Sequence, residues 1–96
     1  KTQTFFIKSL IADAQSLMNS AKTNELLAET KKVYETVRYS DPMSNDKLFE
    51  LDSQIRGQFT VFADAVKSED TELAKETANA LIEMVELRNQ KVKLLK

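Results

Sequence analysis

The amino-acid sequence predicts an all-α protein, an antiparallel up-down bundle of three long helices in one domain that spans residues 1–96. Apolar residues recur at spacings of three and four along nearly the whole chain, which is the period of an amphipathic helix. The chain also contains one Gly and one Pro, where an ordinary chain of this length has roughly six or seven Gly and about five Pro. Because sheets need turns and turns use these residues, the composition excludes an all-β or α/β fold.

The N-terminal segment, about 4–39, has a helical pattern whose apolar face changes direction. Two apolar stripes, one before and one after residues 19–24, are rotated by roughly 150° from each other if the helix is continuous. Residues 19–24 (NSAKTN) are rich in poor helix formers and in good helix caps. Two alternatives therefore stay open. The segment is one long helix whose halves meet different partners, or it breaks near 20–24 and gives a four-helix bundle.

A reversal of the chain is predicted near Pro42, in the segment 39–44 (YSDPMS). Proline disfavours a helical residue before it and cannot occupy a helix interior. The next helix, about 44–68, is therefore expected to be capped either by Asp41, with Pro42 at its first position, or by Ser44.

The two C-terminal helices, about 44–68 and 70–95, each carry one continuous apolar stripe. The first stripe contains Leu48, Leu51, Ile55, Phe59, Phe62 and Val66, and the second contains Ala74, Ala78, Leu81, Val85, Val92 and Leu95. Asp70 is a good N-cap for the last helix, with Glu72 in its first turn. The link between the helices is so short that we expect them to lie antiparallel.

The composition excludes most active-site chemistries. The chain has no Cys and no His, which removes thiol and imidazole catalysts and Cys/His zinc sites. Its only Gly is Gly57, inside a predicted helix, so no phosphate-binding loop is present. Arg38, Arg56 and Arg88 fall on different helices and do not converge on one site. We therefore expect no enzyme, no catalytic residue, no cofactor and no metal.

The charge of the chain is balanced overall but unevenly distributed. Fourteen Lys and Arg against fifteen Asp and Glu give a net charge of −1, which offers no basic excess for a nucleic-acid partner. Residues 41–70 hold seven acidic and three basic side chains, whereas residues 87–96 hold four basic and no acidic ones. The basic end complements the dipole of the last helix. The alternative is a surface that binds a partner or lipid.

A candidate interaction surface lies near the start of the chain and consists of Phe5, Phe6, Ile7, Leu10 and Ile11. If the first helix is continuous, residues 5–15 project on the order of 15 Å beyond the bundle and need another chain or a membrane surface to cover them. If the helix breaks near residue 22, the same residues fill the core. Phe49, which lies off the stripe of its helix, is expected to pack over the 39–43 link, and the alternative is a residue that binds a partner.

One ion pair is predicted at the edge of the core. Arg88 lies within about 20° of Leu81 on the apolar stripe of the last helix, and a buried unpaired guanidinium is too costly to leave alone. With a turn near residue 69, Arg88 is level with residues 50–52 of the preceding helix. There Asp52 lies near the stripe and Glu50 points outward, so we predict an Arg88–Asp52 pair. The alternatives are a guanidinium that extends into water and an anion-binding site.

The segment 39–44 (YSDPMS) and the ending 88–96 (RNQKVKLLK) resemble helical regions of uncharacterised bacterial proteins, some of them membrane-anchored. The likeness covers about the last 60 residues. It implies a bacterial, cytoplasmic or cytosol-facing helical domain of a larger protein, and it transfers no catalytic residue. Because the chain begins at Lys1 and not at Met, we likewise expect it to be part of a longer protein.

Together these patterns predict a non-enzymatic interaction or scaffold domain that binds a protein partner or self-associates. The alternative is a sensory or signal-transmitting helical bundle next to a membrane segment. Such a segment would lie outside this chain, because no stretch of the sequence approaches the ~20 apolar residues of a membrane span.

Overall fold

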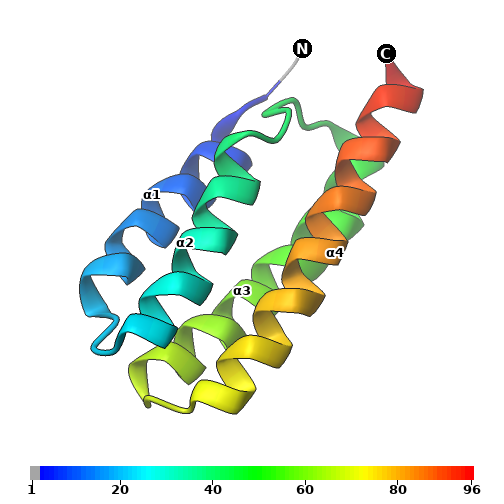
Figure 1. Ribbon diagram of the computed structural model, residues 1–96. Helices are drawn as coiled ribbons and strands as arrows, with labels where there is room; N and C mark the ends of the chain where they lie inside the picture. Colours follow the sequence, from blue (N-terminus) through cyan, green and yellow to red (C-terminus); the bar gives the residue numbers. More distant parts are fainter. Residues whose placement is uncertain (1–2) are drawn as a thin grey trace.

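The computed structural model describes residues 3–96, which form an all-α fold, as the sequence predicts. The α-helices are α1 (Phe5–Ser20), α2 (Asn24–Arg38), α3 (Phe49–Lys67) and α4 (Thr71–Leu95), and a single 3₁₀ turn, η1 (Asp46–Leu48), precedes α3 (Figure 1). The expectation of a longer protein was drawn from Lys1, which lies outside the described residues.

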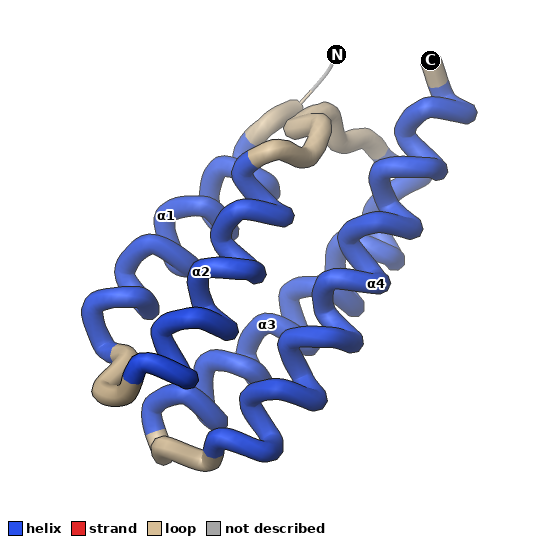
Figure 2. Tube along the Cα trace, viewed as in Figure 1, coloured by secondary structure: helices blue, strands red, loops and turns tan. Residues whose placement is uncertain are grey.

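The segment 4–39 forms two helices in the structure. α1 ends at Ser20, and both Ala21 and Thr23 have extended backbone angles. The hydroxyl oxygen of Thr23 accepts the N–H of Leu26 at 3.1 Å and so caps α2. Because α2 runs back along α1 (Figure 2), the apolar faces of both halves reach the same core.

The helices form two hairpins that pack against each other. α1 packs against α2 and α3 against α4, and the hairpins meet where α2 contacts α4 and where α1 contacts α3. The α2–α3 connection, residues 39–45, which we call the crossover segment, crosses from one hairpin to the other over one end of the molecule (Figure 1). The molecule is 40 Å long. The start of α1 and the last turn of α4 lie at the same end. We call it the crossover end and define it as residues 3–5, 39–49 and 92–96.

The core contains the apolar stripes that the sequence predicts for α3 and α4. Every stripe residue is buried except Leu51 and Leu95, which are half-buried. In α1 and α2 the buried apolar residues are Ile7, Leu10, Ala14, Leu17, Leu26, Val33 and Val37. Across residues 3–96, no helix combines the length and the apolar character needed to cross a bilayer.

The predicted cap of the last helix is confirmed, but the predicted caps of the preceding helix are wrong. Asp70 caps α4, because its carboxylate accepts the N–H three residues further on at 3.2 Å. Neither Asp41 nor Ser44 caps α3. The Asp41 carboxylate instead accepts the N–H of Met43 at 2.9 Å, and Asn45 caps η1. The chain needs the residues up to 45 to cross the end of the bundle, so its helix starts later than predicted.

The turn between α3 and α4 contains a residue with a left-handed backbone, Glu69, whose φ is 59°. The N–H groups of Glu69 and Asp70 donate to the carbonyls of Val66 and Ala65 at 3.1 and 2.9 Å. This is the Schellman arrangement of hydrogen bonds, in which glycine usually takes the left-handed position. A glutamate at this position is strained, because its Cβ crowds the backbone.

Candidate functional site

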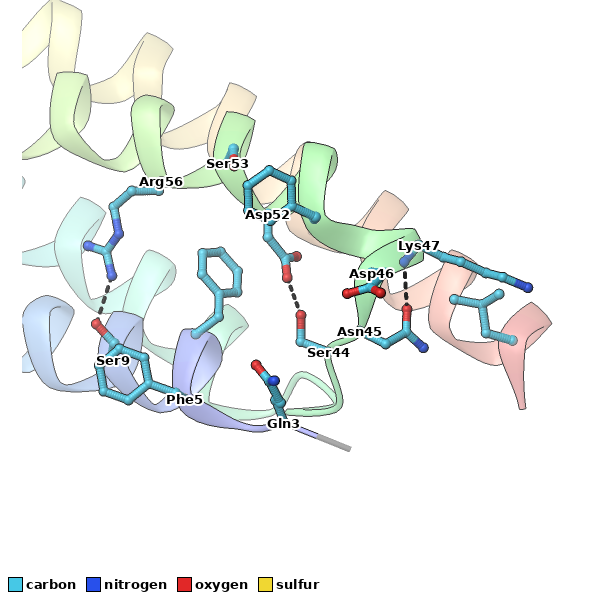
Figure 3. A pocket seen from close by; sticks show the side chains of 13 residues that line it. Gln3, Phe5, Ser9, Ser44, Asn45, Asp46, Lys47, Asp52, Ser53 and Arg56 are labelled. Atoms are coloured by element: carbon cyan, nitrogen blue, oxygen red, sulfur yellow. Dashed lines mark hydrogen bonds between the residues drawn. The ribbon is translucent and has the colours of Figure 1, made fainter. Parts of the chain in front are cut away.

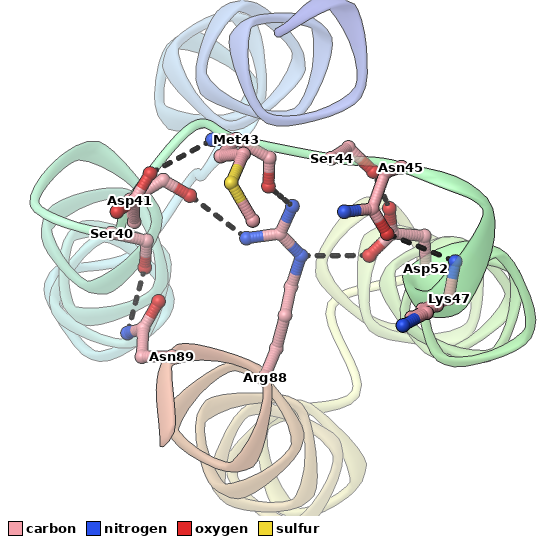
Figure 4. Close-up of polar contacts among 9 residues, drawn as sticks. All are labelled: Ser40, Asp41, Met43, Ser44, Asn45, Lys47, Asp52, Arg88 and Asn89. Carbon is pink, nitrogen blue, oxygen red and sulfur yellow. Dashed lines mark hydrogen bonds and ion pairs between the residues drawn. The ribbon is translucent and has the colours of Figure 1, made fainter. Parts of the chain in front are cut away.

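Arg88 is the largest fully buried side chain among the described residues, with none of its surface exposed. It lies on the inner face of α4, between the buried residues Val85 and Val92. Its side chain extends across the bundle to the underside of the crossover segment (Figure 4). A guanidinium in this position must be fully paired to be tolerated.

Each nitrogen of the Arg88 guanidinium has its own acceptor. Nε donates to Oδ1 of Asp52 on α3 at 2.7 Å. Nη1 and Nη2 donate to the backbone carbonyls of Asp41 and Met43 at 2.8 and 2.7 Å. The guanidinium also lies 5.6 Å from the centre of the Phe6 ring, within the range of a cation–π contact. The structure thus brings together Arg88 and Asp52, the two residues of the ion pair predicted from the sequence.

Asp52 links Arg88 to the start of the described chain. Asp52 is 6 % exposed, and its second carboxylate oxygen, Oδ2, accepts a hydrogen bond from the hydroxyl of Ser44. The backbone of Ser44 pairs with that of Gln3 through N–H to carbonyl bonds of 2.7 and 3.2 Å. Continuous contacts therefore join α4, α3, the crossover segment and the residues before α1. We call Arg88, Asp52, Ser44 and the carbonyls of Asp41 and Met43 the Arg88 network.

The Arg88 network holds the crossover segment on the bundle. This segment has no helix to pair its carbonyls, and buried backbone groups need partners. Arg88 supplies donors to two of these carbonyls, and Asp52 neutralises its charge. Each nitrogen of the guanidinium and both oxygens of the carboxylate make a hydrogen bond inside the protein, so the two charges are balanced within the fold.

Sequence reasoning missed three members of this network, which are Ser44 and the carbonyls of Asp41 and Met43. Backbone carbonyls leave no trace in a residue pattern, because every residue has one. The available signal is Pro42, which marks a segment without helical hydrogen bonds at the height of Arg88. A buried arginine next to such a segment is well placed to pair its carbonyls.

The other two arginines lie apart from Arg88. Arg56 pairs with Asp13 at 2.8 Å and donates to the hydroxyl of Ser9 at 2.8 Å, which ties α3 to α1. Arg38 is exposed at the end of α2 and donates to a tyrosine hydroxyl one turn earlier at 3.0 Å. Their partners differ, so the arginines form three separate contacts and not one anion site.

Two titratable groups have displaced pKa values. Hydrogen bonds from the Lys96 ammonium and from the N–H of Met43 lower the pKa of Asp41 below its ordinary value. A hydrogen bond to the hydroxyl of Tyr34 raises the pKa of Arg38. Both pKa values move away from neutrality, so neither group becomes an acid or base suited to proton transfer at pH 7. Among the described residues, no group of three or more carboxylates is placed to hold a metal ion.

A groove of about 780 Å³ opens between α1 and α3 at the crossover end (Figure 3). We call it the end groove. Its apolar lining consists of Phe5, Phe6, Phe49 and Leu95, and polar side chains surround them. Two of the charged side chains in the groove, Asp52 and Arg56, already have partners within the protein.

The five residues predicted as a candidate interaction surface differ in their exposure in the structure. Ile7 and Leu10 are completely buried in the core, which is the alternative expected if the helix breaks near residue 22, so they do not belong to the candidate interaction surface. Phe6 and Ile11 are half-buried against the core, and Phe5 is 79 % exposed. The turn between α1 and α2 explains this outcome. Because the chain reverses there, α1 packs along α3 and does not project beyond the bundle.

Phe49 was expected to pack over the 39–43 link, and this prediction is wrong. Its side chain is 72 % exposed and forms one wall of the end groove. The link is instead held from inside the bundle, where the guanidinium of Arg88 binds two of its carbonyls. The crossover end therefore carries more exposed apolar surface than the sequence pattern indicates.

Comparison of the chain with known protein families, curated proteins and solved structures finds no match in any of the three. No activity or partner is therefore transferred to the protein from a relative, and its function is inferred from its own residues.

Proposed function

We propose that the protein is a non-enzymatic interaction domain that binds its partner through the crossover end. The scaffold in this proposal is an antiparallel bundle of four helices, an arrangement supported by the short turns within each hairpin. The observation that carries the proposal is the gathering of exposed Phe5, Tyr39, Phe49 and Leu94 at this end. Exposed apolar side chains that stand singly are ordinary, whereas a group of them marks a binding surface.

The charged side chains near this surface also support binding over catalysis. A catalytic site needs free groups that converge on a reacting atom. Arg88 and Asp52 are engaged with each other and with the crossover segment, and Arg56 is engaged with α1. Three pairs of neighbouring carboxylates on the helices and η1 are all exposed, and exposed carboxylates rarely act as acid–base pairs: Asp46 with Glu50, Glu72 with Glu76, and Glu83 with Glu86.

Photocrosslinking in the cell that produces the protein tests this function. A photoreactive phenylalanine analogue at position 49 should give one dominant adduct to the partner. The matched control carries the same analogue at position 61, because Val61 is also an exposed apolar residue of α3 but lies about 18 Å further along the helix. No adduct to a protein or to a lipid at position 49, or the same adducts at both positions, would overturn the proposal.

A second candidate function is signal transmission between the bundle and a membrane segment outside this chain. The Arg88 network favours it, because one set of hydrogen bonds joins the crossover segment to both hairpins. Loosening the crossover with Pro42→Gly should then raise amide hydrogen exchange in the last turns of α4 as well as in the crossover itself. Exchange in α4 that stays unchanged would reject the coupling.

A further inference from the structure

The most protruding apolar side chains among the described residues all belong to the crossover end. Phe5, Tyr39, Phe49 and Leu94 are 79, 80, 72 and 86 % exposed, whereas no other large apolar side chain exceeds the 56 % of Leu87. Side chains with so little contact stand out from the surface and do not lie flat on it. They suit a partner into which each can insert separately.

The arrangement of these four residues favours a flat partner. They belong to the start of α1, the end of α2, the start of α3 and the last turn of α4. These ends of the four helices lie at the same end of the bundle (Figure 1), so the four residues do not form a stripe along one helix. A partner helix docks along a stripe or groove, whereas a flat partner that meets the end of the bundle touches all four residues.

A second copy of the chain, stacked end to end, offers too little contact. The molecule measures 20 × 17 Å across its long axis, so its end has a flat footprint of about 340 Å². A stable protein interface buries about 800 Å² of accessible surface on each partner, which so narrow an end reaches only if the flanks of the bundle also take part. A lipid surface has no such requirement, because each apolar side chain that enters the headgroup boundary contributes by itself.

The charge of the molecule is polarised in the direction that such a surface requires. The exposed basic residues of the crossover end are Lys47, Lys93 and Lys96, and exposed Lys91 lies on the adjoining turn of α4. Asp41, which pairs with Lys96, and Asp46 offset part of their charge. Directly beside the crossover end, exposed Arg38 and Glu50 balance each other in charge. The opposite end, around the α3–α4 turn, carries exposed Asp64, Glu69, Asp70 and Glu72. Exposed Lys67 and Lys22, which pairs with Glu69, offset part of this charge. The basic end is thus also the end with the protruding apolar side chains.

We propose that the crossover end docks on the surface of a lipid bilayer that contains anionic phospholipids, an inference that rests on the proposed interaction function. Phe5, Tyr39, Phe49 and Leu94 enter the boundary between headgroups and acyl chains, where aromatic side chains are favoured. The lysines contact the anionic headgroups. The bundle stands on the membrane with its acidic end pointing away, which keeps the carboxylates of the α3–α4 turn far from the negative surface.

Cosedimentation of the purified 96-residue chain with vesicles tests the proposal. Phosphatidylcholine vesicles with about 30 % phosphatidylserine should bind the chain, and salt raised to about 0.5 M should weaken binding. Phe49→Ser combined with Leu94→Ser should lower the affinity at least tenfold, by roughly the loss expected for two inserted side chains. The matched control, Val61→Ser with Leu73→Ser, removes exposed apolar side chains elsewhere and should bind like the unmodified chain.

The fold of each variant is checked by its thermal melt, which these exposed positions should leave unchanged. Lys91→Gln with Lys93→Gln gives a second variant that removes charge without touching apolar groups, and it should also bind anionic vesicles more weakly. Equal losses of vesicle binding in the Phe49→Ser, Leu94→Ser variant and in its matched control, or no binding by the unmodified chain, would overturn the lipid inference.

The crosslinking at position 49 separates this failure from failure of the proposed function. An adduct to a protein, together with no vesicle binding, overturns the lipid surface as partner and keeps the interaction domain. No adduct and no vesicle binding overturn both. A dimer that Phe49→Ser converts to a monomer, with no vesicle binding, identifies a second copy as the partner and also overturns the lipid inference.

Discussion

Removal of either residue of the Arg88–Asp52 pair should strongly destabilise the protein. Asp52→Ala leaves a fully buried guanidinium with two carbonyl acceptors and no counter-charge. Arg88→Met leaves a buried carboxylate with the hydroxyl of Ser44 as its hydrogen-bond donor. Breaking a buried pair in this way costs about 3–5 kcal/mol, a large part of the roughly 5–15 kcal/mol by which small domains are stable. We expect each single variant to lower the free energy of unfolding by that amount.

The double variant, Asp52→Ala with Arg88→Met, should cost less than the two single changes added together. No uncompensated charge remains in it, and methionine keeps an apolar side chain along the path of the arginine stem. The carbonyls of Asp41 and Met43 still lose their donors, so the double variant should remain about 1–3 kcal/mol less stable than the unmodified chain. With single changes of about 3–5 kcal/mol each, the coupling energy within the cycle should be about 3 kcal/mol or more.

Urea unfolding followed by circular dichroism measures the four free energies of the cycle. The matched control is the Arg56–Asp13 pair, which also joins two helices at 2.8 Å but has side chains that are 37 and 50 % exposed. Such exposed pairs contribute about 0.2–1 kcal/mol, so the cycle of Arg56→Met and Asp13→Ala should give a coupling no larger than that. Additive effects at Arg88 and Asp52, or equal coupling in both cycles, would refute the reasoning that burial makes this pair strong.

Phe62→Ala should lower the free energy of unfolding by about 3–5 kcal/mol, whereas Val61→Ala should lower it by less than about 1 kcal/mol. The reason is that Phe62 is completely buried and Val61 is not. Equal midpoints of urea unfolding in the two variants would contradict the assigned inner face of α3. Glu69→Gly should stabilise the protein by roughly 1 kcal/mol in thermal melts, because glycine accepts the left-handed backbone without strain. Glu69→Ala keeps that strain and is the control; a gain of the same size in Glu69→Ala would assign the effect to the lost charge. Acidification from about pH 5 to about pH 2 should remove stability in part through Asp41, whose pKa is lowered chiefly by Lys96. A carboxylate with a lowered pKa stabilises the fold above its ordinary pKa, and this contribution disappears as the pH falls through the lowered value. Asp41→Asn should therefore flatten the dependence of stability on pH in this range, and an unchanged slope in acid titrations would contradict the linkage.

Much of the architecture follows from the local geometry of helices, which the sequence by itself determines. The stripes of α3 and α4 and the cap at Asp70 depend on residues within a few turns of one another. The Arg88–Asp52 pair follows from the same geometry, because a helix has a fixed rise and rotation and a short turn sets which residues lie level across a hairpin. A guanidinium on an apolar face needs a carboxylate at its own height, and Asp52 is the residue that fulfils this condition.

Only the tertiary structure decided the path of the chain in the connections between helices, where the sequence has no helical periodicity. The break after Ser20 depends on whether α1 gains more from packing against α2 and α3 than from continuing as one helix, and weak helix formers in the turn permit either result. That choice placed Ile7 and Leu10 inside the core. The exposure of Phe49 likewise depends on the route of the crossover segment over the bundle. Helical periodicity is a property of neighbouring residues, whereas the route of a connection and the partner of each helix face depend on contacts summed over the whole core.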